Sequence, residues 1–406
     1  MSEHIFGVID IGTSKIGAAI FGASRKGINI KSICAKETDG IVQGAVIEPE
    51  KTAATIKVVM RNAIEMADIM PEKVFGILGG SGVKSFVSKG VRVRKEGNRA
   101  KMVDAIFKAI GSSEIFSMMP DGKLIDFKFF VENDSKADND FSEQIYEGDI
   151  IAFAASISSV DNAQAAFNMA GVYADELIAG QLAISEGVSS EDKHWENAII
   201  IDIGADVTDI LVYIDGKLVL TEAHHLAGNI ITQDLVYMLR LSKATAEGLK
   251  RNFGNALPEE IIEHASILIP TTEDWESDTI NLKFASKVIA ARVEEIFELC
   301  KKIILTNKIE ISKNVFTQGV ILTGGGALLH GVDVVASRVF GLPARLVEPQ
   351  IEIRAPKGFR RHQFATLVGG MILAYKREIL GIDCDESDSL NASFWESLRQ
   401  WIYERL

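Results

Sequence analysis

Two short segments carry the residue types that nucleotide chemistry needs. One is Asp10-Ile11-Gly12-Thr13-Ser14-Lys15, and the other is Asp202-Ile203-Gly204-Ala205-Asp206-Val207. In each, an apolar run ends in Asp-Ile-Gly, a short turn follows, and a second apolar run begins. Glycine lets the main chain approach a phosphate, whose oxygens bind backbone N–H groups. The repetition predicts two similar half-molecules that face one cleft.

Asp10 and Asp202 end equivalent predicted strands of the two copies. Carboxylates hold Mg²⁺ directly or through its waters, so we expect these two to hold a magnesium ion through water. In the first copy Thr13, Ser14 and Lys15 supply hydrogen-bond donors and one positive charge. Two ordinary hairpin turns are the alternative, and the repetition in matching context favours the nucleotide site.

A third glycine-rich turn follows a predicted buried strand late in the chain. It reads Thr323-Gly324-Gly325-Gly326. Three glycines between a strand and a helix let the main chain lie flat against an adenine or a ribose. After the two Asp-Ile-Gly hairpins, this turn predicts the adenosine part of the same site.

Composition limits the class of protein. The chain has 406 residues, too many for one compact core, and its formal net charge is −13. That charge argues against nucleic acid as a partner, because a basic face supplies most of the affinity in such proteins. The three cysteines are far apart and have no ligand spacing, which argues against a disulfide framework and a zinc site. No window holds 18 consecutive apolar residues.

Apolar periodicity predicts the elements that carry these turns. We expect strands at 5–36 (three), 74–78, 148–155, 173–179, 197–203, 207–214, 217–224 and 320–322, and helices at 50–69, 159–170, 286–309 and 365–379. Residues 242–270 are expected to be helical with loops. Between 81 and 146 the pattern predicts short strands at 91–93 and 124–131, a helix near 101–110 and an acidic loop at 132–140.

The expected fold class is α/β, a two-lobed, duplicated fold with a small inserted α+β subdomain and a C-terminal amphipathic helix. The predicted parts are the first lobe (1–80 and 147–196), the inserted subdomain (81–146), the second-lobe core (197–242 and 312–364), its helical subdomain (243–311), a helix returning to the first lobe (365–382), a linker (383–392) and the terminal helix (393–406).

These motifs resemble the actin/Hsp70/sugar-kinase ATPase superfamily and, within it, the FtsA family of bacterial cell-division proteins. The resemblance extends to four further segments and covers nearly the whole chain, but is weak at 85–146. The segments are Gly40–Val46, Ala227–Leu235 (similar to the family's segment before its second-half helix), Ala246–Lys250 with Gly254, and Val320–Gly326.

The resemblance implies ATP or ADP as a ligand together with Mg²⁺. The implied ligand-binding residues are Asp10, Gly12, Thr13, Ser14 and Lys15, then Asp202, Gly204, Ala205 and Asp209, then Glu247 and Lys250 at the ribose, and Gly324, Gly325 and Gly326 at the adenosine. It also implies self-association into protofilaments through the inserted subdomain. Arg292 matches the family position near the groove for the C-terminal tail of the ring protein FtsZ; a solvated helix arginine is the alternative.

The second hairpin departs from the family pattern, Asp-Ile-Gly-Gly-Gly-Thr. Here Ala205 and Asp206 stand in place of two glycines, and Val207 replaces a hydroxyl residue. Ala205 adds a Cβ where the backbone would touch a phosphate, and Asp206 adds a negative charge near a polyanion. We therefore expect nucleotide to bind but hydrolysis to be slow or absent.

The last residues predict an amphipathic helix with a capping box at Ser393 and Glu396. Its apolar arc holds Phe394, Trp395, Leu398, Trp401 and Ile402. Such a helix after the acidic linker is suited to lie in a membrane interface; docking on its own domain is the alternative. The expected location is the cytoplasmic face of the inner membrane at the division site, as a peripheral protein.

The resulting hypothesis is an ATP-binding actin-like protein that polymerises at the membrane and tethers the FtsZ ring. Two alternatives stay open. A pilus-assembly scaffold of the same fold would lack the terminal amphipathic helix. A sugar or acetate kinase would need a catalytic carboxylate and a substrate pocket, for which the sequence offers no obvious candidate.

Overall fold

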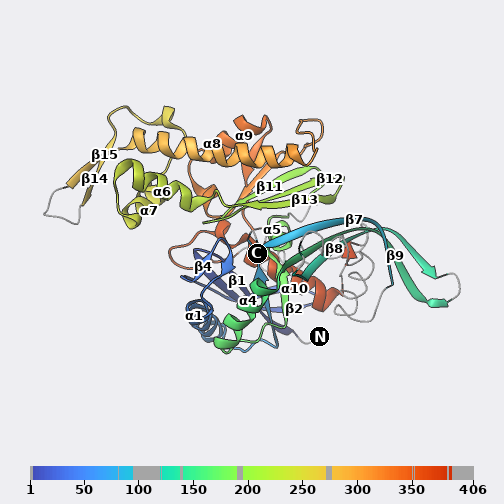
Figure 1. The fold of residues 1–406 in the computed structure, drawn as a ribbon. Helices are drawn as coiled ribbons and strands as arrows, with labels where there is room; N and C mark the ends of the chain where they lie inside the picture. The colour runs from blue at the N-terminus through green and yellow to red at the C-terminus, as the bar shows by residue number, and fades with distance from the viewer. Residues whose placement is uncertain are drawn as a thin grey trace. The chain divides into compact units, whose positions relative to one another are not determined.

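The computed structural model describes residues 3–80, 82–94, 119, 121–137, 140–189, 195–270, 277–349, 351, 353–381 and 384–385 (Figure 1). The chain divides into two compact units. The first comprises Met1–Trp195, Gly216–Glu222 and Glu348–Leu406, and the second comprises Glu196–Asp215 and Ala223–Val347. The predicted terminal helix at 393–406 and the predicted helix near 101–110 lie outside the described residues.

The first unit is built on a five-stranded sheet of order β10-β6-β1-β2-β3. Its strands are β1 (His4–Ile11), β2 (Lys15–Ser24), β3 (Gly27–Glu37), β6 (Lys73–Leu78) and β10 (Glu176–Ala179). β1, β2 and β3 are antiparallel neighbours, β6 runs parallel to β1, and β10 runs parallel to β6. The central strands are buried on both faces, which is why they read as nearly continuous apolar runs.

Helices cover this sheet. α1 (Pro49–Ala67) packs on β2 and β3 and against α4 (Ile157–Met169), and α10 (Ala365–Tyr375) packs on β1, β2 and β6 beside α5 (Gly180–Val188). Two two-residue strands, β4 (Ile41–Val42) and β5 (Ala45–Val46), precede α1. A Cβ on Gly369 would overlap the carbonyl of Ala183, so glycine there lets the backbones of α5 and α10 touch.

The second sheet repeats the first. Its order is β13-β12-β11-β16-β17, with β11 (Ala198–Ile203), β12 (Thr208–Ile214), β13 (Lys217–His224), β16 (Val320–Thr323) and β17 (Ala344–Leu346). β11 and β12 are antiparallel, β16 is parallel to β11, and β17 is parallel to β16. β11, β12 and β13 correspond to β1, β2 and β3, while β16 corresponds to β6 and β17 to β10. With this correspondence the two sheets have the same strand order. The predicted duplication, and with it the α/β fold class, is confirmed.

Helices also accompany the second sheet. They are α6 (Gly228–Leu239), α7 (Lys243–Phe253), α8 (Leu282–Thr306) and α9 (Val332–Phe340). Short 3-10 turns lie at Pro258–Glu260 and Gly326–Leu328, and another lies in the first unit at Arg361–Phe364. The predicted long helix is confirmed, but it begins four residues earlier, at Leu282. Asn281 determines that start because its side chain accepts a hydrogen bond from the Phe284 N–H at 2.8 Å.

The strands predicted at 91–93 and 124–131 are present but much longer than expected, and the acidic loop predicted at 132–140 is wrong over 132–137. The described part holds three long strands, β7 (Val83–Arg94), β8 (Gly122–Ala137) and β9 (Asp140–Ser156), and 132–137 lies inside β8 (Figure 1). β9 pairs with both others in an antiparallel sheet, and β18 (Cys384–Asp385) adds in parallel to β8. Cross-strand backbone hydrogen bonds hold polar residues extended as well as apolar ones, so composition alone misleads here.

Two further predictions need correction. Ser266–Pro270, expected among helices and loops, is a strand (β14) paired with β15 (Ser277–Asn281). Gly228–Leu235, expected to precede a helix, is the first part of α6 itself. The residue before that helix is Ala227, which offers no side-chain cap, so the usual start signal is missing. No helix in the described part of the chain is long and apolar enough to cross a membrane.

His224 gives the second unit a pH-dependent contribution to stability. The Leu226 N–H donates to Nδ1 at 3.2 Å, so Nε2 carries the proton and faces the buried Sγ of Cys300 at 3.2 Å. Burial, aided by the charge of His225, lowers the pKa of His224 from 6.5 to about 4. The neutral ring is therefore favoured in the folded state, and its contribution is present above pH 6.5 and lost as the pH falls towards 4.

We expect this group to account for up to about 3 kcal/mol of lost stability between neutral pH and pH 4, at about 1.4 kcal/mol per pKa unit. Urea unfolding followed by circular dichroism over this range measures it. His224→Asn should make the free energy of unfolding depend less on pH, whatever the substitution does to stability at neutral pH. If the free energy of unfolding of the variant falls as steeply with pH as before, His224 is not the cause.

Candidate nucleotide-binding site

The β1–β2 hairpin of the first unit carries one group of predicted ligand residues. The Gly12 N–H donates to the Lys15 carbonyl at 3.1 Å and closes the turn. Asp10 lies at the end of β1, opposite Gly17 on β2 and beside Ile77 on β6. The Thr13 hydroxyl oxygen accepts from the Gly44 N–H at 3.1 Å, which ties the turn to the Gly-rich connection after β3.

Asp10 is suited to a cation. Burial raises the pKa of this carboxyl, and the neighbouring Lys15 only partly opposes the rise. A divalent ion nearby would favour the charged carboxylate that burial disfavours, so the site fits Mg²⁺. Lys15 is itself buried and lies over the Phe364 ring, with Nζ 4.8 Å from the ring centre. This ring beneath Lys15 was not predicted, because Phe364 is remote in sequence.

The β11–β12 hairpin of the second unit has the same geometry. The Gly204 N–H donates to the Val207 carbonyl at 2.9 Å, as Gly12 does to Lys15. Asp202 lies opposite Asp209 on β12 and beside Thr323 on β16. A Cβ on Gly204 would lie 2.8 Å from the Val207 carbonyl oxygen, and one on Gly12 would lie 2.9 Å from that of Lys15. Both glycines are thus required by the turn itself.

The first turn of α6 packs against this second hairpin. The Gly228 N–H donates to the Gly204 carbonyl at 3.1 Å, and the Asn229 N–H donates to the Ala205 carbonyl at 2.7 Å. The Asn229 amide also donates to the Asp206 carboxylate at 2.6 Å. Asp206, one of the unusual residues of this hairpin, is therefore held at the N-terminus of a helix, where the helix dipole favours a negative charge.

Glu247 and Lys250 on α7 reach the same place. Lys250 Nζ lies 2.7 Å from Glu247 and donates to the Gly228 carbonyl at 2.8 Å and to the Thr232 hydroxyl at 2.7 Å. Burial alone would raise the pKa of Glu247. The charge of Lys250 and the hydrogen bonds that the Glu247 carboxylate accepts hold that pKa below its usual value. The pair is charged and joins α7 to the start of α6.

The glycine-rich turn follows β16 beside Asp202. Gly324 has a φ of +87°, and a Cβ there would overlap the Asp202 carboxylate. A Cβ on Gly326 would overlap Ile203. Thr323, which ends β16, is fully buried, and its hydroxyl has no hydrogen-bond partner among the described residues. The second unit therefore brings together Asp202, Gly204, Ala205, Asp209, Glu247, Lys250 and the turn 324–326.

Arg292 lies apart from this cluster, on α8. Its guanidinium binds Asp234 on α6 through two contacts, Nε–Oδ2 at 2.6 Å and Nη2–Oδ1 at 2.9 Å, and it also contacts Glu295. The contact with Asp234 joins α8 to α6. The predicted membrane residues Phe394, Trp395, Leu398, Trp401 and Ile402 lie outside the described residues.

Comparison with solved structures identifies the class of protein that these sheets and hairpins define: the actin-like ATPase fold. The "PilM-PilN type IV pilus biogenesis complex" matches with a TM-score of 0.61 at 16% identity, over 91% of this chain and 98% of that one. MreB5 of Spiroplasma citri bound to ADP matches with a TM-score of 0.55 at 14% identity, over 92% and 98%. The MamK double helical filament matches with a TM-score of 0.53 at 13% identity, over 91% and 98%.

Within this class the sequence matches one family. The family model "Cell division protein FtsA" matches residues 199–369. FtsA of Neisseria meningitidis serogroup B is 28% identical over 385 residues, which cover 93% of this chain and 91% of that protein. FtsA of Borreliella burgdorferi is 27% identical over 361 residues, 86% of each chain. The predicted resemblance is confirmed: the chain is similar to the FtsA cell-division proteins over most of its length.

Proposed function

We propose that the protein is an actin-like cell-division protein that binds ATP or ADP with Mg²⁺ through its two Asp-Ile-Gly hairpins. One observation carries this proposal: two hairpins of the same hydrogen-bonded geometry place Asp10 and Asp202 at the ends of equivalent strands. In the proposed complex, both carboxylates hold the waters of Mg²⁺. The phosphates are held by Thr13, Ser14, Lys15 and the turn at Gly204. Glu247 and Lys250 contact the ribose, and Gly324–Gly326 the adenosine.

Nucleotide acts here as a structural ligand that favours the closed form of the lobes. Ala205, Asp206 and Val207 stand where the family pattern has two glycines and a hydroxyl residue. The carboxylate of Asp206 stays on the hairpin, bound to Asn229, so its charge adds to that of a bound polyphosphate. Hydrolysis is therefore slow, with turnover at saturating MgATP below about 1 per second in a phosphate-release assay.

The proposed role is to tether the FtsZ ring to the cytoplasmic face of the inner membrane at the division site. The terminal residues Phe394, Trp395, Leu398, Trp401 and Ile402 supply the membrane contact. Full burial of these side chains would contribute at most roughly 7–15 kcal/mol, and shallow immersion gives a fraction of that. One helix therefore binds reversibly, and self-association into protofilaments provides stable attachment through many copies.

The FtsZ tail is proposed to dock where α6 meets α8. Arg292 is about a quarter exposed and held by Asp234, and next on the same face of α6 come Tyr237 and Met238, which are 84% and 49% exposed. An aromatic and a thioether side chain beside a positioned arginine suit a short peptide with apolar and acidic residues. Arg292→Lys, which retains the charge but loses the two-point contact with Asp234, should weaken binding of a synthetic FtsZ tail peptide.

Co-sedimentation with liposomes tests the tether. The full chain should pellet with liposomes and bring a labelled FtsZ tail peptide with it, whereas a chain ending at residue 390 should remain in the supernatant and still bind the peptide. A full chain that stays in solution at every lipid concentration would contradict the membrane role. It would favour the second candidate, a pilus-type scaffold, which the likeness to PilM supports at the level of fold.

A further inference from the structure

β3 is the outer strand of the first unit's sheet, and its far edge is unpaired within the described part of the chain. β2 pairs with its inner edge, from Ser24–Gly27 to Lys15–Glu37. In an antiparallel pair, alternate residues direct their N–H and C=O groups away from the neighbour. Such an open edge can take an additional strand, and proteins usually blunt or cover it.

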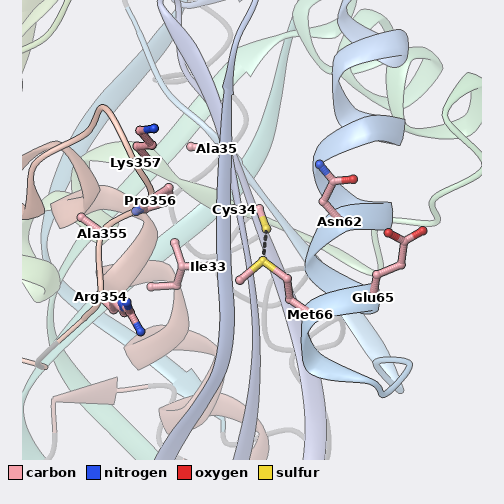
Figure 2. A pocket seen from close by; sticks show the side chains of 10 residues that line it. All are labelled: Ile33, Cys34, Ala35, Asn62, Glu65, Met66, Arg354, Ala355, Pro356 and Lys357. Carbon is pink, nitrogen blue, oxygen red and sulfur yellow. Dashed lines mark hydrogen bonds between the residues drawn. The ribbon is translucent and has the colours of Figure 1, made fainter.

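A groove of 580 Å³ runs along this open edge (Figure 2). Its lining comes from residues 33–35 of β3, from α1, and from the loop 354–357. Figure 2 shows α1 on one side of the strand and the loop on the other, with Cys34 and Met66 pointing towards each other. All of these elements belong to the first unit.

The side chains of β3 divide the groove into two faces. Ser32 donates its hydroxyl to the Ala63 carbonyl on α1 at 2.7 Å, and Cys34 Sγ lies 3.2 Å from Met66 Sδ, so both face α1. Successive strand residues point to opposite faces, so Ile33 and Ala35 face the loop. On the α1 face Met66 is 66% exposed beside Asn62 and Glu65, and Glu65 is paired with Arg61 at 3.7 Å.

The loop face is basic. Arg354 and Lys357 are exposed, and within the described residues neither has a carboxylate at ion-pair distance. Pro356 and Ala355 lie between them. On a chain with a net charge of −13, two cations that have no ion pair among the described residues give this strand edge a local positive charge, which suits a negatively charged partner.

We propose that the outer edge of β3 binds an extended, acidic peptide segment of a partner protein as an added strand. Backbone hydrogen bonds to β3 hold the segment, its apolar side chains contact Cys34 and Met66, and its alternate carboxylates face Arg354 and Lys357. The β3 edge of a second copy does not fit, because antiparallel pairing would bring the basic loops of both copies to the same face. This surface is independent of the nucleotide site.

Binding of a designed peptide tests this. The probe is fluorescein-labelled Val-Glu-Val-Glu-Val-Glu, the comparison peptides are Val-Lys-Val-Lys-Val-Lys and a scrambled acidic sequence, and the protein is the full chain. We expect saturable binding of the alternating acidic peptide alone. Bound peptide should slow hydrogen exchange of backbone amides in residues 31–37, because the open edge gains hydrogen bonds.

Two pairs of variants locate the site. Arg354→Glu with Lys357→Glu should weaken binding about tenfold or more, whereas Arg25→Glu with Lys26→Glu, the same charge change in the exposed β2–β3 turn, should not. Met66→Lys should weaken binding, and Met70→Lys should not, although Met70 is equally exposed at 67%.

Several results would overturn the proposal. They are the absence of saturable binding, equal binding of the lysine peptide, exchange protection confined to other elements, and equal loss in both members of either variant pair. Self-association of the free chain that Met66→Lys abolishes would also overturn it, because it would assign this edge to a second copy.

Discussion

Gly324→Ala is expected to lower the free energy of unfolding by about 3 kcal/mol or more. Gly324 has a φ of +87°, which an alanine adopts only with strain, and a Cβ there would overlap the Asp202 carboxylate and lie 2.6 Å from the Ile203 carbonyl oxygen. The turn after β16 must then move away from the end of β11. Because Asp202 is a proposed magnesium residue, nucleotide affinity should fall as well.

Gly216→Ala is the matched control. Gly216 has a φ of +76° in the turn between β12 and β13, and a Cβ there would meet nothing within 4 Å. It should cost about 1 kcal/mol, from backbone strain alone. Urea unfolding of both variants measures the difference. Equal losses would show that the close approach to Asp202 has no energetic consequence.

Arg377→Met is expected to destabilise the first unit by about 3–5 kcal/mol. Arg377 and Asp126 are 5% and 0% exposed, and Nη2 lies 2.7 Å from Oδ1. The substitution removes this cation from the buried Asp126 carboxylate, which also accepts hydrogen bonds from the N–H groups of Ala179 and Phe127. An unpaired buried charge is costly because the interior solvates it poorly.

Two comparisons isolate this effect. Lys73→Met removes an ion pair with Glu378, in which Lys73 is 45% exposed, and should cost less than about 1 kcal/mol. Asp126→Asn in the Arg377→Met background should recover part of the loss, since the amide carries no charge. Thermal unfolding measures the loss of stability in each variant. If Arg377→Met costs no more stability than Lys73→Met, the buried pair is not important for stability.

This pair belongs to a set of contacts that holds the segment after α10. Lys376 binds Glu186 on α5 at 2.8 Å, Arg377 binds Asp126 on β8, and Glu378 binds Lys73 on β6 at 2.7 Å. Burial alone would raise the pKa of Glu186, but Lys376 and Lys128 hold that pKa far below its usual value. Three consecutive side chains thus join the segment that follows α10 to α5, β8 and β6.

The sequence predicted what depends on local pattern. The two Asp-Ile-Gly hairpins indicated the duplication, and the range 217–224 predicted for β13 is the one observed. Gly180–Val188 was not assigned to a helix, because every residue of α5 is buried and no periodicity marks it. The start of α6 was missed because Ala227 is no N-cap, although α6 carries Asn229 and Thr232 into the site.

Long-range partners lay beyond sequence reasoning. Arg377 and Asp126 are 251 positions apart, and Lys376 and Glu186 are 190 apart. Arg292 was assigned to a partner site from resemblance alone, and its contact with Asp234, 58 positions away, became visible only in the fold. Side-chain pairing of this kind depends on how the helices pack, which a single sequence does not specify.

Calorimetric titration of the full chain with ATP measures whether the two Asp-Ile-Gly hairpins bind a nucleotide. We expect the chain to bind one nucleotide, with an affinity that rises when Mg²⁺ is present. Asp10→Asn and Asp202→Asn should each remove most of this dependence on magnesium, while Lys250→Ala should weaken binding with and without the metal. If ATP and ADP do not bind under any of these conditions, or if Asp10→Asn and Asp202→Asn leave the affinity unchanged, the hairpins are not a nucleotide site.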